Sequence, residues 1–218
     1  LPILLYFEEL SFESICDIYK REDAYGIVIS MGGQEPNNLA VSLNDAGLNI
    51  LGTSVDSIDT CEDRSRYSNL LDSLNITQPD WTCASSTEEI DIFVEKVGFP
   101  ILVRPSYVLS GAAMQIVSNL EKLQNCLKLA NSVSPDHPIV LTKFIENAVE
   151  VDVDAVANSG DLICYAMSEH IENAGVHSGD ASLVLPSYSL TESQKETMLH
   201  VIKELGKALN ISGPYNTQ

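Results

Sequence analysis

The segment 26–52 restricts the possible folds more than any other part of this sequence. It begins with a short continuous apolar run at 26–30, which is typical of a parallel strand that is buried on both faces. Two glycines follow, then a helical segment at 38–46 and a second apolar strand at 49–52. A strand, a glycine loop, a helix and a strand in this order predict the βαβ unit of a nucleotide-type α/β domain.

The glycine pair of this unit, Gly32 and Gly33, does not define a ligand site. It lacks the spacing of the G-x-G-x-x-G motif that dinucleotide-binding domains carry. The pair therefore predicts a tight turn at the carboxyl end of a sheet strand.

The charge of the chain excludes several kinds of partner. The 218 residues include 31 acids but only 12 Lys and Arg, which gives a formal net charge of −19. Such a charge repels nucleic acid, so we expect neither DNA nor RNA as a partner. No apolar run reaches the roughly 18 residues that a membrane span needs, so no membrane is expected either. The charge also repels nucleotides, so a phosphate site must concentrate the few cations locally. The candidates are Arg64, Arg66, Arg104 and Lys143, although each of them alone is typical of an exposed surface residue.

The cysteines indicate a reducing environment. They are odd in number and include no C-x-x-C pair, which argues against a disulfide framework and a structural zinc site: Cys16, Cys61, Cys83, Cys126 and Cys164. We expect reduced, mostly buried thiols in an intracellular protein. The cytoplasm is the expected compartment, with the mitochondrion as the alternative.

The rest of the chain predicts an α+β arrangement. The Pro-containing link at 77–81 is the best candidate for a domain boundary in the sequence. The acids of the strand 150–156 alternate with apolar residues, so they share one face. Amphipathic helices are expected near 63–74, 86–97, 120–130 and 191–209, with capping-box spacing for Ser86 with Glu89 and for Thr191 with Gln194.

The run from Val103 to Met114 combines a strand, a cation and a glycine-containing loop. The strand leads into Arg104, and we expect Pro105 to end its regular ladder. A hairpin with an arginine at its base and Gly111 at its tip can lay backbone N–H groups over a phosphate. The same composition fits a purely structural hairpin, so this run alone leaves both interpretations open.

Together these segments resemble the second, C-terminal synthetase half of carbamoyl-phosphate synthetase large chains, in a eukaryotic-like form. The resemblance rests on the stretches 5–9, 31–34, 104–114, 150–155 and 168–180. It implies an ATP-grasp fold of mixed α/β and α+β class. A Rossmann-like pre-ATP-grasp domain at 1–60 would precede a C-terminally truncated ATP-grasp domain at 61–218, with a lid subdomain at about 98–145.

The resemblance also implies an activity and a set of site residues. In this family ATP phosphorylates carbamate to give carbamoyl phosphate and ADP, with Mg²⁺ or Mn²⁺ as the metal. The implied partners are ATP and carbamate, the first synthetase half of the same chain, and a glutaminase subunit or domain. The implied roles are phosphate binding and catalysis for Arg64 and Arg104, the lid for Gly111, the adenine pocket for Lys143 and Ile145, the ribose hydroxyls for Glu150, the nucleotide site for Gly175, Val176, His177 and Ser178, and the first metal ligand for Gln218.

Several other interpretations stay open. Glu150 also fits a solvated strand acid, His177 a loop residue bonded to backbone, and Gln218 a polar residue without a role. A non-catalytic nucleotide-binding or regulatory module is one alternative function, and another ATP-grasp ligase such as a biotin carboxylase is a second. The family's other metal ligands would follow Gln218, and one amide oxygen does not replace a carboxylate for Mg²⁺. We therefore expect this chain, as a piece of a longer polypeptide, to bind ATP weakly without turnover.

Overall fold

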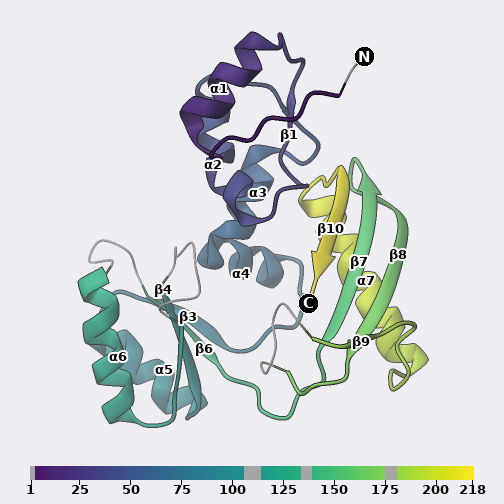
Figure 1. Cartoon of the computed structure of the whole chain (residues 1–218). Helices are drawn as coiled ribbons and strands as arrows, with labels where there is room; N and C mark the ends of the chain where they lie inside the picture. The colour runs from purple at the N-terminus through teal and green to yellow at the C-terminus, as the bar shows by residue number, and fades with distance from the viewer. Residues whose placement is uncertain (1–2, 106–113, 134–138, 175–180) are drawn as a thin grey trace.

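The computed structural model describes residues 3–105, 114–133, 139–174 and 181–218. The N-terminal part forms a small α/β unit (Figure 1). Its elements are α1 (Phe12–Arg21), β1 (Ile27–Val28), α2 (Gln34–Asp45), β2 (Ile50–Leu51) and α3 (Val55–Glu62). The strands β1 and β2 pair in parallel, with Ile27 opposite Ile50, which confirms the predicted βαβ unit.

Two details of this unit differ from the sequence-based expectation. Val28 is 56% exposed, so the prediction of a strand buried on both faces is wrong. Helix α2 begins at Gln34 rather than near residue 38. Gly33 precedes it with a φ of 72°, a conformation that glycine adopts at little cost, so the chain turns into the helix at once.

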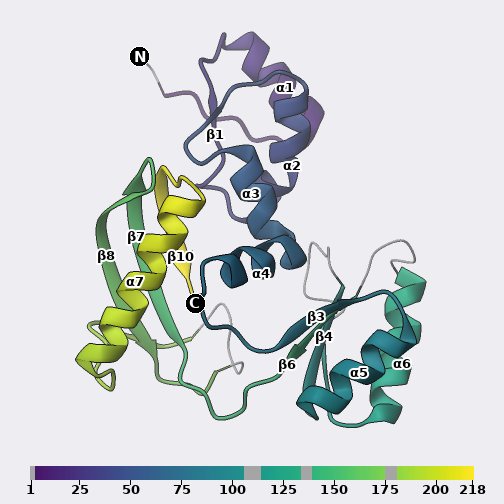
Figure 2. The ribbon, with the colours of Figure 1, turned by 180° about the vertical axis from the view of Figure 1, so that it is seen from behind.

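Two lobes follow helix α4 (Arg64–Ser73), one on each side of the C-terminal residue (Figures 1 and 2). The sheet of the first lobe has the strand order β3-β6-β4-β5, and that of the second lobe has the order β10-β7-β8-β9. The first lobe consists of β3 (Trp81–Ala84), α5 (Thr87–Val97), β4 (Ile101–Pro105), β5 (Gln115–Val117), α6 (Leu120–Val133) and β6 (Ile139–Lys143). The second consists of β7 (Val151–Asn158), β8 (Asp161–His170), β9 (Leu183–Val184), α7 (Glu192–Ala208) and β10 (Gly213–Thr217).

Strand alternation decides which side chains of the first lobe face the core. Ile101 and Val103 of β4 are fully buried and pack with Phe93 of α5 and Leu123 of α6. The intervening positions of β4 point to the opposite face of the sheet, because successive side chains of a strand alternate. Arg104 therefore lies on the face that the two helices leave uncovered.

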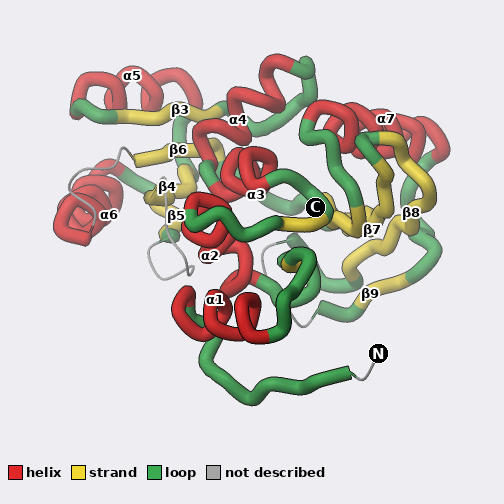
Figure 3. The backbone as a smooth tube through the Cα atoms, turned by 90° about the horizontal axis from the view of Figure 1, so that it is seen from above, coloured by secondary structure: helices red, strands yellow, loops and turns green. Residues whose placement is uncertain are grey.

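The second lobe follows the same rule. Val153 and Ala155 of β7 pack against Ile202 of α7, so Asp152 and Asp154 lie on the opposite face, as the alternation predicted. Viewed from above, α5 and α6 lie by one sheet, α7 lies by the other, and α3 and α4 lie between the lobes (Figure 3).

The predicted hairpin around Arg104 is confirmed at its strands. Ile101 of β4 pairs with Val117 of β5 in an antiparallel ladder. Pro105 is the last residue of β4 and still pairs with Ile139 of β6; the chain that follows lies outside the described residues, so the expected end of the ladder at Pro105 stays a prediction. Proline is tolerated there because it occupies the last position of β4, where the ladder with β5 has already ended at Val103.

The two predicted capping boxes behave differently. Thr191 and Gln194 form the complete reciprocal box at the start of α7. At α5 the Ser86 hydroxyl accepts from the backbone N–H of Glu89, but the Glu89 carboxylate accepts from the N–H of Ser85. The second half of that box is therefore displaced by one residue.

The cysteines correct a further expectation. All five are free thiols, but only Cys126 is buried, and Cys61 and Cys164 are exposed. The prediction of mostly buried thiols is therefore wrong. In the described ranges, none of the helices combines the length and the apolar character that crossing a membrane requires.

Candidate functional site

A cavity of about 620 Å³ lies between the two lobes. Its walls come from α4, the link at 78–79, the uncovered faces of β4 and β6, and the segment that follows β6. Five of the predicted site residues line it, although they are far apart in the sequence: Arg64, Arg104, Lys143, Ile145 and Gln218. The structure thus brings three of the four candidate cations to one surface, whereas Arg66 forms ion pairs with Asp56 and Asp59 instead.

Arg64 is held at the first position of α4. The Asp63 carboxylate caps this helix, because it accepts hydrogen bonds from the backbone N–H groups of Ser65 and Arg66, each at 2.9 Å. The Arg64 Nη2 lies 3.9 Å from the Sδ of Met114, the residue that precedes β5. Burial lowers the pKa of Arg64, and the negative charge of Glu62 opposes that effect.

Arg104 reaches the cavity from β4. Its Nη2 donates to the Thr142 hydroxyl at 2.7 Å, and Thr142 itself belongs to the neighbouring strand β6. Its Nε is buried and finds no hydrogen-bond partner in the described part of the chain. The pKa of Arg104 is lowered, first by burial and then by the positive charge of Arg64. Two partly desolvated guanidinium groups that repel each other form a site that an anion with several oxygens would stabilise.

Lys143 and Ile145 occupy the segment that leaves β6. The Lys143 ammonium donates to the carbonyl oxygens of Phe99 at 2.8 Å and Gly98 at 3.3 Å, just past the C-terminal end of α5. Its charge is therefore directed at the end of that helix, while its stem lines the cavity. Ile145 is 52% exposed and offers an apolar surface beside it. Lys143 is therefore already bonded to two backbone carbonyl oxygens.

Glu150 lies in the second lobe, immediately before β7, and belongs to a buried ionic cluster. The backbone N–H of His170 donates to the backbone carbonyl oxygen of Glu150 at 3.0 Å. The imidazole Nδ1 of His170 lies 4.0 Å from Glu150 Oε2. His170 Nε2 lies 2.7 Å from Asp152 Oδ2, and only 6% of the histidine is exposed. Asp152 Oδ1 is buried without a hydrogen-bond partner among the described residues.

The protonation of His170 follows from this surrounding. The hydrogen bond to Asp152 raises the pKa of His170, burial opposes the rise, and the charges of Glu150, Asp152 and Glu172 add to it. The imidazole of His170 thus lies between the carboxylates of Glu150 and Asp152. Neither Asp152 nor His170 was expected as a site residue from the sequence. The available signal was the alternating acids of one strand opposite a histidine at the end of the returning strand.

The remaining candidates cannot be placed. Gly111 falls within 106–113, and Gly175, Val176, His177 and Ser178 fall within 175–180, so all five lie outside the described residues. Their assigned contacts with a nucleotide stay predictions.

The described residues do not fit a complete site for a divalent metal. Gln218 lines the cavity and could supply one amide oxygen. Within the described ranges, no group of three or more His, Cys, Asp or Glu side chains is arranged to hold a metal ion. Because Mg²⁺ demands near-octahedral oxygen ligation, this donor set alone is insufficient.

Comparison with known protein families gives a consistent result. The model of the carbamoyl phosphate synthase preATP-grasp domain matches residues 3–60, and that of the carbamoyl-phosphate synthase L chain, ATP binding domain, matches residues 63–218. The arginine-specific carbamoyl phosphate synthase large chain of Eremothecium gossypii is 55% identical over 214 residues, which cover 98% of this chain and 19% of that protein. Multifunctional protein URA2 of Saccharomyces cerevisiae is 49% identical over 214 residues, covering 98% of this chain and 10% of that protein. The chain therefore spans between a tenth and a fifth of the length of these relatives.

Solved structures extend the similarity at the level of the fold. The biotin carboxylase domain of 2-oxoglutarate carboxylase from Hydrogenobacter thermophilus, solved with MgADP and bicarbonate, superposes with a TM-score of 0.75. The match covers 94% of this chain and 46% of that chain at 20% identity. A biotin carboxylase from Campylobacter jejuni gives a TM-score of 0.72 at 16% identity, over 95% of this chain and 48% of that one. At such identities the likeness describes the fold alone.

Proposed function

The chain belongs to the carbamoyl-phosphate synthase large-chain family, and from this premise we propose that it binds ATP between its lobes and phosphorylates carbamate as the second synthetase half of a larger enzyme. The observation that carries the proposal is the pair of desolvated, mutually repelling guanidinium groups of Arg64 and Arg104 in one cavity. Repulsion between cations disfavours the empty site and favours a polyphosphate. We also propose a division of the chain into a pre-ATP-grasp domain at 1–60 and an ATP-grasp domain at 61–218, with a lid subdomain at about 98–145.

Each described residue has a distinct role in this proposal. Phosphoryl transfer requires mainly positioning and charge neutralisation, and the planar guanidinium of Arg104 can contact two phosphate oxygens at once. The stem of Lys143 and the exposed side chain of Ile145 provide a surface for the adenine ring. Glu150, held by His170, accepts hydrogen bonds from the ribose hydroxyls. Carbamate is already an anion, so its attack on the γ-phosphate needs no general base.

The metal enters this proposal as part of the substrate, MgATP, or MnATP as the alternative. Gln218 would contribute one oxygen ligand to that ion, and no step is assigned to the metal itself, because the described donor set is incomplete. The first synthetase half of the same chain and a glutaminase subunit or domain are the proposed macromolecular partners. We place the parent protein in the cytoplasm, or in mitochondria as the alternative, since two fungal relatives are named as mitochondrial chains.

The proposal is tested in the parent enzyme. Arg104→Ala should strongly lower carbamate-dependent ADP release, while bicarbonate-dependent ATP hydrolysis by the first synthetase half stays at the wild-type rate. Equal loss of both rates would contradict the assignment to the second half. Tight ATP binding without carbamate-dependent turnover in the wild-type parent would instead make this region a non-catalytic nucleotide-binding module.

A further inference from the structure

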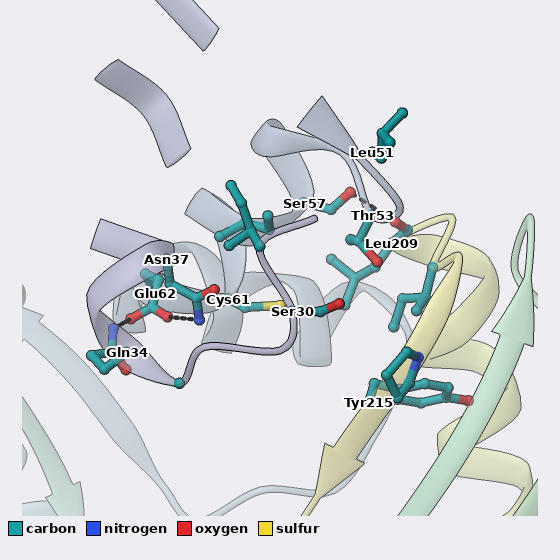
Figure 4. Close-up of a pocket in the computed structure, with 15 residues that line it drawn as sticks. Ser30, Gln34, Asn37, Leu51, Thr53, Ser57, Cys61, Glu62, Leu209 and Tyr215 are labelled. Carbon is teal, nitrogen blue, oxygen red and sulfur yellow. Dashed lines mark hydrogen bonds between the residues drawn. The ribbon is translucent and has the colours of Figure 1, made fainter. Parts of the chain in front are cut away.

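A second cavity lies where the N-terminal α/β unit meets the second lobe, and the proposed reaction does not use it (Figure 4). Its volume is about 430 Å³, which is typical of sites for small molecules. The cavity lies at the carboxyl ends of β1 and β2, where parallel α/β units commonly bind ligands. Helices α2 and α3 form one side, and the C-terminal end of α7 with β10 forms the other.

The polar end of this cavity is a carboxylate that two amides hold in place. Gln34 Nε2 donates to Glu62 Oε2 at 2.9 Å, and Asn37 Nδ2 donates to Glu62 Oε1 at 3.2 Å. Figure 4 shows the three side chains together at one end of the cavity. A carboxylate offers about four acceptor positions, so two hydrogen bonds leave room for further donors from a ligand.

The other end of the cavity is apolar. Its lining includes Ile29, Leu51, Ile58, Leu209 and Ile211. The Tyr215 hydroxyl donates to the Ile202 carbonyl oxygen at 3.0 Å, so the aromatic ring of this residue lines the cavity while its polar atom is bonded elsewhere. A ligand that fits therefore has an apolar part and a polar group at one end.

The charge of the lining decides which polar group is favoured. Among the described residues that line the cavity there is no Lys, Arg or His. Desolvation raises the pKa of the Cys61 thiol to about 11, so this group is neutral at physiological pH. Glu62 thus supplies a negative charge without a lining cation, which disfavours anions such as carbamate or phosphate and favours an ammonium group.

We infer that this cavity binds a small primary amine with an apolar group, whose ammonium donates to Glu62 and whose hydrocarbon part packs on Ile58 and Leu209. Binding there affects the first cavity, because Cys61, the neighbour of Glu62, lines both cavities, and the charge of Glu62 opposes the lowering of the pKa of Arg64 by burial. An ammonium that neutralises Glu62 makes the potential around Arg64 more positive. The amine and ATP therefore favour each other's binding, a coupling that rests on the proposed function of the first cavity.

Amine binding is tested by calorimetry without nucleotide, with isopentylammonium as the probe. Isopentanol and isovalerate have the same hydrocarbon part with a neutral and an anionic end. We expect the ammonium to bind more tightly than the alcohol and isovalerate not to bind. Glu62→Gln should raise the Kd of isopentylammonium by about tenfold or more, which corresponds to the loss of one charge-assisted hydrogen bond. Ile58→Phe, which fills the apolar end and keeps Glu62, should abolish binding.

Other outcomes would overturn the inference. These are no binding of the ammonium to the wild type, equal binding of alcohol and ammonium, or ammonium binding that neither variant weakens. With the amine saturating, the Kd of ATP should fall by roughly fivefold, and ATP should tighten the amine by the same factor. An unchanged Kd would refute the coupling. Absence of ATP binding would refute the proposed function, while the titration without nucleotide still decides the amine site.

Discussion

Replacing Arg104 by methionine should separate its cost to the fold from its contribution to ligand binding. Arg104→Met keeps an unbranched side chain on β4 but removes the guanidinium. The lost hydrogen bond from a charged donor to Thr142 costs about 1.5–3 kcal/mol. Removing the buried, unpartnered Nε and the repulsion from Arg64 stabilises the folded state by about 1–3 kcal/mol or more. We therefore expect the free energy of unfolding to change by no more than about 1 kcal/mol, or ~2–4 °C in melting temperature.

Binding should respond much more strongly than stability. Loss of one charge-assisted contact to a phosphate costs about 1.5–3 kcal/mol, which raises the Kd of MgATP by about 10- to 100-fold. Urea unfolding and calorimetry on the same samples measure the two effects. Arg66→Met is the matched control, because Arg66 lies on the same helix as Arg64 but is bonded to Asp56 and Asp59 outside the cavity. Destabilisation above about 2 kcal/mol with an unchanged Kd would show that Arg104 is a structural residue.

Three further predictions concern the second lobe and a turn. Glu150→Gln should weaken ATP by about tenfold but leave the competition by inorganic triphosphate unchanged, since only the ribose contact is lost; equal effects on both ligands would contradict the ribose role. His170 has a raised pKa, so its stabilising effect is complete below about pH 6.5 and is lost as the pH rises through the higher folded value. The difference in unfolding free energy between the wild type and His170→Asn, measured with urea from pH 6 to 9, should therefore decrease with rising pH, and a constant difference would refute this. Gly47→Ala should lower the free energy of unfolding by about 1 kcal/mol, because the φ of Gly47 is 82°. Gly160→Ala should lower it further, because Gly160 has a φ of 84° and its added Cβ would lie only 2.9 Å from Lys207 Cα. Comparable urea midpoints for the two variants would show that the turn at Gly160 relaxes.

Local patterns in the sequence predicted the parts of the fold that local physics decides. The glycine loop between two apolar runs predicted the parallel pairing of β1 with β2. The alternation in β4 and β7 fixed which side chains face a helix and which face the space between the lobes. Strand periodicity suffices for this, because one face of each sheet is covered by helices and the other is not.

The alternating pattern alone could not establish that His170 faces the acids, because this pairing depends on a single irregular position. Near the turn, Asn158 pairs with Asp161, and continuing that register without interruption would place Met167 opposite Asp152. The register shift at Val156/Ala157 places Ser168 there instead. A shift by one residue moves every later side chain of β8 to the other face, so His170 faces the acids only because of this bulge. No turn or propensity signal in the sequence marks its position.

The site arginines were beyond local prediction for a different reason. Arg64 begins a helix and Arg104 is the penultimate residue of a strand. Their proximity is decided by how α4 packs between the lobes, which no sequence periodicity predicts. Only the resemblance to a known family linked them in advance.

The resulting arrangement has an energetic consequence of its own. In a chain of net charge −19, placing two of the few cations in one partly desolvated cavity opposes folding, as their lowered pKa values indicate. A bound polyphosphate removes that penalty, so ATP should stabilise the wild type by RT ln(1 + [ATP]/Kd), about 2.7 kcal/mol at a hundredfold excess over Kd. In Arg104→Met most of the penalty is already absent, and so is most of the affinity. With a Kd that is 10- to 100-fold higher, the same ATP concentration is only about one to ten times the Kd of the variant and should stabilise it by about 0.4–1.4 kcal/mol, so its melting temperature should rise by about half the wild-type shift or less. Equal shifts in both proteins would place the nucleotide elsewhere.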